Sequence, residues 1–150
     1  MERILVLLKP DAVQRGVCGE IIGRLEKRGL KLIAMKMLIM DRDLARKHYA
    51  AHVDKAFFEG LIDFITSGPL VALVAEGRNA IESVRSTMGA TDPLHASPGT
   101  IRGDYAQSVG QNLIHGSDSQ KAAEAEINLF FSTKEIMDYQ REMDKWVIES

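Results

Sequence analysis

The chain has 150 residues, 45% of them hydrophobic, which is enough apolar material for one hydrophobic core but not comfortably for two. Its formal net charge of −2 leaves no excess of positive charge, so extended nucleic-acid binding across a basic face is disfavoured. A single cysteine, Cys18, excludes an internal disulfide, and no apolar stretch has the length of a membrane span, so we expect a cytoplasmic protein without a membrane partner.

Apolar spacing in the first half of the chain predicts two strands and three helices. Residues 4–8 form an apolar run of strand length, which Lys9-Pro10 ends, and helical spacing follows up to Gly29, where a helix should end. A long buried strand is expected at residues 30–40. Two consecutive helices, at residues 43–51 and 57–65, should come next.

The second half begins with a strand at residues 70–75. Asn79 and Glu82 then have the spacing of a capping pair, for a helix that Gly89 ends. Residues 90–111 show little periodicity, so we expect a long functional loop there. After this loop we expect, in order, a strand at residues 113–115, a helix at residues 119–130, and a late helix with a capping box at Ser132 and Glu135.

This order of elements suits an α+β fold. We expect a ferredoxin-like βαββαβ sandwich with an antiparallel sheet and a helical pair inserted before the third strand. Residues 1–150 should form a single domain, because no linker, repeat or low-complexity segment interrupts the chain.

Residues 112–119, with the sequence NLIHGSDS, place a histidine at the end of a short apolar stretch and just before a helix start. Imidazole is the one side chain whose unperturbed pKa lies near neutrality. His115 can therefore be an unprotonated nucleophile and still form a reactive phosphoramidate. This makes His115 the candidate nucleophile.

Glu126 lies on an apolar stripe of the helix that follows, where an unpaired charge is costly. If this helix folds back on the preceding strand, Glu126 can accept a hydrogen bond from one nitrogen of His115. The other nitrogen is then free to attack phosphorus. Spacing alone equally allows a solvated Glu126 and a His115 that packs in the core.

The four histidines include a pair, His48 and His52, with the i, i+4 spacing of a metal site. No Glu or Asp completes a ligand set at suitable spacing, so we expect surface histidines. Phe57 and Leu61 have the same spacing, which on its own favours core packing. Cys18 has no histidine or basic neighbour in sequence and is expected to be a packing residue.

The segment around His115 resembles the nucleoside diphosphate kinase family, as do Lys9-Pro10-Asp11 and residues 98–104, PGTIRGD, and the resemblance runs from end to end. It implies the same fold, with the inserted helical pair and the long loop as two walls of a nucleotide cleft. It also implies transfer of the γ-phosphate from a nucleoside triphosphate to a nucleoside diphosphate, by a ping-pong mechanism through phosphorylated His115. No P-loop or protein-kinase signature is present.

Further site residues follow from the resemblance alone. Each lysine or arginine, taken singly among 19, indicates only a surface charge. The resemblance implies catalytic roles for His115, Glu126, Lys9 and Tyr49, phosphate binding by Lys9, Arg85, Thr91 and Arg102, and base or ribose contacts by Phe57, Leu61, Val109 and Asn112. A base held between apolar faces is hardly read at its edges, so broad base specificity is expected.

Mg²⁺ is the expected cofactor, held mainly through nucleotide phosphates and water, since no carboxylate cage is visible. The chain departs from the family pattern around the cleft, at Ala56, Asp92 and the Leu94-His95 pair. None of these replaces a group with a chemical role. They affect loop rigidity and affinity, and His95 is not expected to take part in the chemistry.

Two non-enzymatic functions are alternatives: a binding module that keeps the pocket as a sensor, and an RNA-binding module of similar βαββαβ order. Every matched catalytic position is filled, which argues against the sensor. The chain lacks the aromatic strand motif of an RNA-binding module, and its net negative charge disfavours binding to RNA.

A homo-oligomer is expected. Pro93 and Pro98 stiffen the long loop, and residues 146–148, Trp-Val-Ile, form an apolar cluster beyond the predicted core that needs a partner. The resemblance favours a hexamer over a tetramer.

Overall fold

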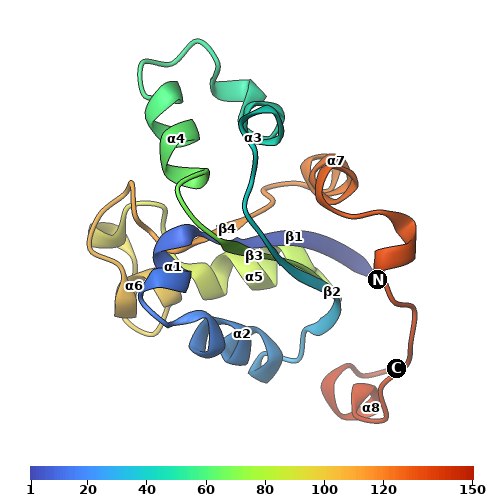
Figure 1. Ribbon diagram of the computed structural model, residues 1–150. Coiled ribbons are helices and arrows are strands. Elements are labelled where there is room, and N and C mark those ends of the chain that lie inside the picture. Colours follow the sequence, from blue (N-terminus) through green and yellow to red (C-terminus); the bar gives the residue numbers. More distant parts are fainter.

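Strand β1 (Glu2–Leu8) is one of the two inner strands of a four-stranded antiparallel sheet with the order β2-β3-β1-β4 (Figure 1). The structure, a computed structural model, describes residues 1–150. The other strands are β2 (Lys31–Leu38), β3 (Leu70–Gly77) and β4 (Ile114–Gly116). Both inner strands are buried on both faces, which explains why they are continuous apolar runs rather than alternating ones.

The helices and turns occupy the connections between strands. The α-helices are α1 (Pro10–Gln14), α2 (Cys18–Lys27), α3 (Arg42–His48), α4 (Phe58–Ile65), α5 (Ala80–Met88), α6 (Ile101–Tyr105), α7 (Gln120–Phe130) and α8 (Asp144–Val147). Three short 3-10 turns are η1 (Ala50–His52), η2 (Pro93–His95) and η3 (Thr133–Glu135). None of the helices has the length and apolar composition that a membrane crossing requires.

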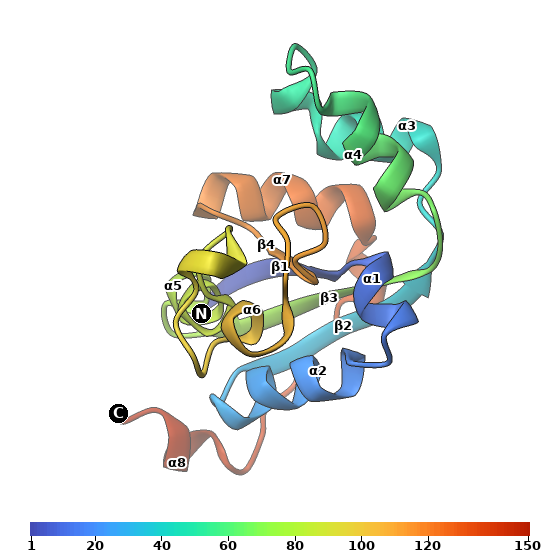
Figure 2. The ribbon, with the colours of Figure 1, turned by 90° about the vertical axis from the view of Figure 1, so that its left-hand side faces the viewer.

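Two hydrophobic cores lie on the two faces of the sheet. Along β1, Ile4 and Val6 point into the core beneath α2 and α5, while Leu5 and Leu7 point into the core beneath α3, α4 and α7. Figures 1 and 2 show these two helical layers on opposite sides of the sheet. The predicted ferredoxin-like sandwich with an inserted helical pair, α3 and α4, is confirmed.

The long loop predicted at residues 90–111 is not free of structure. It contains η2 and α6, and the Thr100 side chain caps α6 by accepting from the Gly103 amide. α6 has only five residues, too short for a readable apolar period. The short helix α1 was not predicted either, because the sequence indicated only that Lys9-Pro10 ends β1.

The predicted capping pair at the start of α5 is wrong. Asn79 adopts a left-handed φ of 54° and its side chain caps nothing. The Glu2 carboxylate, which is distant in sequence, accepts from the Ile81 amide at 2.8 Å instead. The Ser132 and Glu135 capping box does form, but it opens the 3-10 turn η3 rather than an α-helix.

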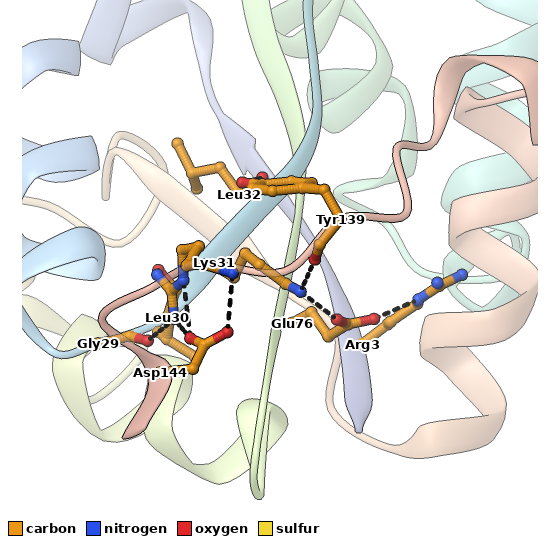
Figure 3. A network of polar contacts seen from close by, with 9 residues as sticks. Arg3, Gly29, Leu30, Lys31, Leu32, Glu76, Tyr139 and Asp144 are labelled. Carbon is orange, nitrogen blue, oxygen red and sulfur yellow. Dashed lines mark hydrogen bonds and ion pairs between the residues drawn. The ribbon is translucent and has the colours of Figure 1, made fainter. Parts of the chain in front are cut away.

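The C-terminal segment, residues 131–150, follows the outer strand β2 (Figure 3). The Tyr139 hydroxyl donates to the Leu32 carbonyl, and the Arg141 guanidinium donates to the carbonyls of Gly29 and Leu30. These bonds satisfy backbone groups just before and at the start of β2. The Met137 amide also donates to the Ile33 carbonyl at 2.8 Å, so the segment covers the first part of the outer edge of β2.

Within this segment, the residues of the apolar cluster at 146–148 differ in their environment. Val147 packs directly over Gly29, whose φ of 95° and lack of a side chain leave room for it. Trp146 is 84% exposed. The expectation that the whole cluster lacks a partner within the chain is therefore wrong for Val147.

Candidate active site

Strand β4 presents His115 from a strained backbone. The Ile114 amide donates to the Asn112 carbonyl at 2.9 Å, across Leu113, whose φ is 74°. A hydrogen bond across one residue at this φ is the signature of the strained form of the γ-turn, which bulky residues rarely adopt. Strain of this kind persists only where the surroundings impose it.

The surroundings here are two residues that follow β1. The Asp11 carboxylate accepts from the Leu113 amide at 3.0 Å, and the Lys9 amide donates to the Leu113 carbonyl at 2.9 Å. Asp11 and Leu113 are both buried. The Lys9-Pro10-Asp11 segment thus holds both backbone groups of the strained residue two positions before His115.

His115 lies opposite Leu7 in the sheet, and its ring meets Glu126 of α7. The distance from His115 Nε2 to Glu126 Oε1 is 2.7 Å, and the Ser117 hydroxyl donates to the same oxygen at 3.1 Å. Burial alone would raise the pKa of Glu126, but the hydrogen bonds from His115 and Ser117 and the nearby histidines bring that pKa below its usual value. His115 Nδ1 makes no hydrogen bond within the protein and is not buried, so it faces solvent.

His48, at the C-terminal end of α3, lies against this pair. Its ring is edge-on to the His115 ring at 4.7 Å between centroids, and both of its nitrogens are buried without a hydrogen-bond partner. Burial, with a smaller effect from His115, lowers the pKa of His48 to about 3. The prediction of surface histidines is wrong for His48, and His52 is half-buried, with its Nδ1 buried and without a hydrogen-bond partner. His95 is exposed. The missed signal for His48 was its position four residues after Leu44, on the inward stripe of α3.

Tyr49 reaches the site through His48, with ring centroids 4.7 Å apart. Burial raises the pKa of Tyr49 to about 12, with a smaller contribution from the Glu126 charge. The Tyr49 ring thus packs on His48, which in turn packs on His115. The role of Tyr49 in supporting the nucleophile remains a prediction.

The Lys9 ammonium lies beside this corner of β4, where Lys9 Nζ donates to Asn112 Oδ1. Asn112 Nδ2 donates in turn to the Thr91 carbonyl at 2.9 Å, which ties the start of the long loop to β4. Burial lowers the pKa of Lys9 to about 8, although Asp11 opposes this and Arg102 adds to it. Thr91 itself is exposed.

Arg102 and Arg85 hold the backbone on either side of His115. Arg102, 5% exposed, donates to the carbonyls of Asn112, Gly89 and Ile114. Arg85 donates to the Gly116 carbonyl at 2.9 Å. A guanidinium has five N–H donors, so Arg102 keeps two and Arg85 four for a bound anion.

The apolar residues expected around a base are partly open to solvent. Phe57, just before α4, is 53% exposed and Val109, in the loop before β4, is 50% exposed. Leu61 on α4 is half-buried. The exposure of Phe57 excludes the reading in which Phe57 packs in the core. In both ribbon views the loop before β4 lies beneath α4 (Figures 1 and 2).

The site gathers groups from distant parts of the chain. The structure brings Lys9, Asn112, Arg102, Arg85, His115 and Glu126 around β4, with Tyr49 one ring removed. Phe57, Leu61 and Val109 lie outside the hydrogen-bond network that joins these groups. An imidazole with one nitrogen fixed and the other open, close to three cations, suits attack on a phosphate.

Comparison with known proteins agrees with this chemistry. The family model for nucleoside diphosphate kinase matches residues 2–136. Nucleoside diphosphate kinases of Archaeoglobus fulgidus and Pelotomaculum thermopropionicum are each 56% identical to this chain over 149 residues, covering 99% of it and at least 99% of theirs. A nucleoside diphosphate kinase of Halobacterium salinarum, solved in complex with CDP, superposes with a TM-score of 0.97 at 53% identity, covering 99% of both chains. The chain therefore belongs to the nucleoside diphosphate kinase family.

Proposed function

We propose that this kinase transfers the γ-phosphate of a nucleoside triphosphate to a nucleoside diphosphate through phosphorylated His115. Enzymes of the family are phosphotransferases that work through a phosphohistidine. The assignment to His115 rests on the different surroundings of its two ring nitrogens. Glu126 holds Nε2 at 2.7 Å while Nδ1 faces solvent, so one nitrogen is oriented and the other is open to a substrate.

The reaction consists of two displacements. First, the Nδ1 lone pair forms a bond to the γ-phosphorus, and the bond from that phosphorus to the bridging oxygen breaks to release the diphosphate. The ring becomes cationic, and the Glu126 carboxylate, which still accepts from Nε2–H, stabilises it. A second diphosphate then attacks the phosphorus and regenerates His115. Ping-pong kinetics follow because the first product leaves before the second substrate binds.

Positive charge for the transition state would come from Lys9, Arg85 and Arg102, while the Thr91 hydroxyl would donate a hydrogen bond to phosphate. Phosphoryl transfer depends mainly on positioning and charge stabilisation, which these side chains supply. Lys9 and Asn112 would also contact the ribose. The arginines already bind backbone around His115, so they can hold the nucleophile and the phosphates at once.

The base would lie against Phe57 and Val109, with Leu61 extending that wall. Exposed apolar side chains stack on any base because every base has a π face, so purines and pyrimidines should both be accepted. The CDP bound by the Halobacterium relative supports a site that takes a pyrimidine diphosphate.

A divalent cation accompanies nucleotide chemistry of this kind, and the ion would be Mg²⁺. Each carboxylate beside β4 already accepts through one oxygen, Asp11 Oδ2 from the Leu113 amide and Glu126 Oε1 from His115 and Ser117, and the second Asp11 oxygen is buried. These residues fit an ion held by nucleotide phosphates and water rather than by a protein cage. When bound, it would neutralise charge on the phosphates.

The catalytic unit would be a single domain across residues 1–150, working in the cytoplasm as a homo-oligomer. A stripe of exposed apolar side chains on the outer strand β2 and just beyond it supports association: Met35, Met37 and Ile39 are 56%, 63% and 65% exposed. A patch of this kind on an open sheet edge favours a protein partner. A hexamer is preferred over a tetramer.

A coupled assay tests the function directly. With ATP as donor, ADP-forming turnover should be supported by GDP, CDP and UDP within a narrow range of kcat/KM. Double-reciprocal plots at several acceptor concentrations should be parallel, as ping-pong kinetics require. Intersecting lines, or turnover with only one base, would contradict the proposal.

A further inference from the structure

His48 carries two buried ring nitrogens that nothing in the protein satisfies. Leaving a buried donor or acceptor without a partner costs roughly 1–3 kcal/mol, and such groups in native proteins call for an explanation. The ring does not point to an empty corner of the core. It rests edge-on against His115 at 4.7 Å and against Phe130 at 5.5 Å, where α3 and α7 pack together (Figure 1).

Three possible metal ligands meet at this point. One ligand atom from each of His48, His115 and Glu126 lies within 4.8 Å of the other two, and His115 Nε2 is 2.7 Å from Glu126 Oε1. Zinc–ligand bonds of about 2.0–2.2 Å set the ligand atoms of a tetrahedral site roughly 3.3–3.6 Å apart. The His115–Glu126 pair is closer than this and the whole set lies within 4.8 Å, so the side chains would rotate to close around an ion.

The donor set selects the type of ion. Two imidazoles and one carboxylate, with a fourth position open, is a combination that zinc enzymes use. Imidazole nitrogens suit zinc and other late transition metals, whereas Mg²⁺ prefers oxygen ligands. The site is thus chemically distinct from the phosphate-bound Mg²⁺ of the reaction.

We propose that His48, His115 and Glu126 bind Zn²⁺ in the nucleotide-free protein, and that zinc bound there inhibits phosphoryl transfer. The ion takes the place of the proton between His115 Nε2 and Glu126. It draws electron density from the ring, so Nδ1 becomes a poorer nucleophile, and it occupies the carboxylate that stabilises the cationic ring.

His52 is the natural competitor for His48 as a ligand, because the two are four residues apart. The structure separates them chemically: the His52 ring lies beside Tyr49 and Phe57, and His52 is not part of the group of ligand atoms. His52 and the exposed His95 therefore serve as matched controls.

Zinc alone, titrated into nucleotide-free protein in competition with a chromophoric chelator, tests the site. Wild type should bind one Zn²⁺ per chain. His48→Gln should weaken binding by at least about 10-fold, the lower limit for losing even an outer partner of a metal ligand. His52→Gln and His95→Gln should bind as wild type does. Equal affinity in His48→Gln, or a matching loss in His52→Gln, would overturn the proposal.

A measurement on the unmodified chain keeps the test independent of how the variants fold. In nitrogen-15 spectra of the imidazoles, one equivalent of Zn²⁺ should shift the ring resonances of His48 and His115 and leave those of His52 and His95 in place. Shifts confined to other histidines, or none, would refute the site. Zinc should also inhibit wild type at a concentration at least about 10-fold lower than His48→Gln, each measured against its own uninhibited rate. Equal sensitivity would contradict the inhibitory role.

Discussion

At the scale of single residues, the central prediction concerns the pair His115 and Glu126. A helix residue reaches a strand residue because α7 folds back over β4, and Ser117 fixes the carboxylate from the other side. Because Nε2 is held by Glu126, we expect Nδ1 to be the reactive nitrogen. The contact was expected from an apolar stripe and a motif, while the catalytic roles of the two residues remain predictions.

Glu126→Gln should preserve the fold and slow turnover about 10- to 100-fold, the scale of losing an outer partner of a reactive group. The amide can still contact the ring but carries no charge to stabilise it. Steady-state kcat is the measurement. Glu124→Gln, on the exposed side of the same helix, is the control and should behave as wild type. If Glu126→Gln is equally fast, Glu126 has no part in the reaction.

Lys9 predicts a pH dependence. Burial lowers the pKa of Lys9 to about 8, so its ammonium is present below that pH and lost above it. Because kcat/KM reports the free enzyme, its value for ATP should fall above about pH 8. Lys9→Arg keeps a cation throughout, so this alkaline decline should vanish in the variant, whatever its absolute rate. An unchanged decline would assign it to another group.

At the scale of elements, β4 depends on a segment from the other end of the chain. The γ-turn at Leu113 is held by Asp11, and it fixes the backbone from which His115 projects. Spacing found the strand but not the turn, because Leu113 carries no side-chain sign of a positive φ. Only a glycine or an asparagine at this position would have indicated a positive φ from the sequence.

Asp11→Ala should lower the unfolding free energy by about 1–3 kcal/mol, the cost of leaving the buried Leu113 amide unpaired. It should also reduce kcat, because the nucleophile loses its fixed backbone. Asp11→Asn keeps an acceptor oxygen and should recover much of both. Denaturant unfolding and kcat, measured well below the Lys9 pKa of about 8, provide the comparison. An alanine variant as stable and as fast as wild type would show that the γ-turn at Leu113 does not depend on Asp11.

Part of what escaped prediction depends on contacts distant in sequence. The helix α5 is capped by Glu2 rather than by Asn79, and a local motif cannot reveal a cap supplied by another strand. For His48, the spacing from Leu44 indicated an inward-facing residue, but its partners, His115 and Phe130, lie on other elements and could not be predicted from that spacing. The sheet and its main helices were predictable since their apolar periods are local.

At the scale of the whole molecule, β2 and the C-terminal segment form the surface best suited to association. Light scattering at micromolar concentration should give six times the 16.6 kDa of one chain. Met37→Lys places a charge on the exposed apolar stripe of the outer strand and should reduce that mass. Gln107→Lys, in an exposed loop, is the control. A mass of 16.6 kDa for wild type would exclude the oligomer, and four times that mass would exclude only the hexamer.

Phosphate labelling tests the central claim, that His115 carries the transferred group. Wild type and His115→Ala are incubated with ATP labelled in the γ-phosphate, without an acceptor, and quenched in acid or in base. Wild type should retain a phosphate that is stable in base and lost in acid, as a phosphoramidate requires, and added CDP should remove it as CTP. His115→Ala, with its fold checked by circular dichroism, should retain none. Labelling that persists in the alanine variant would place the nucleophile elsewhere and contradict the mechanism.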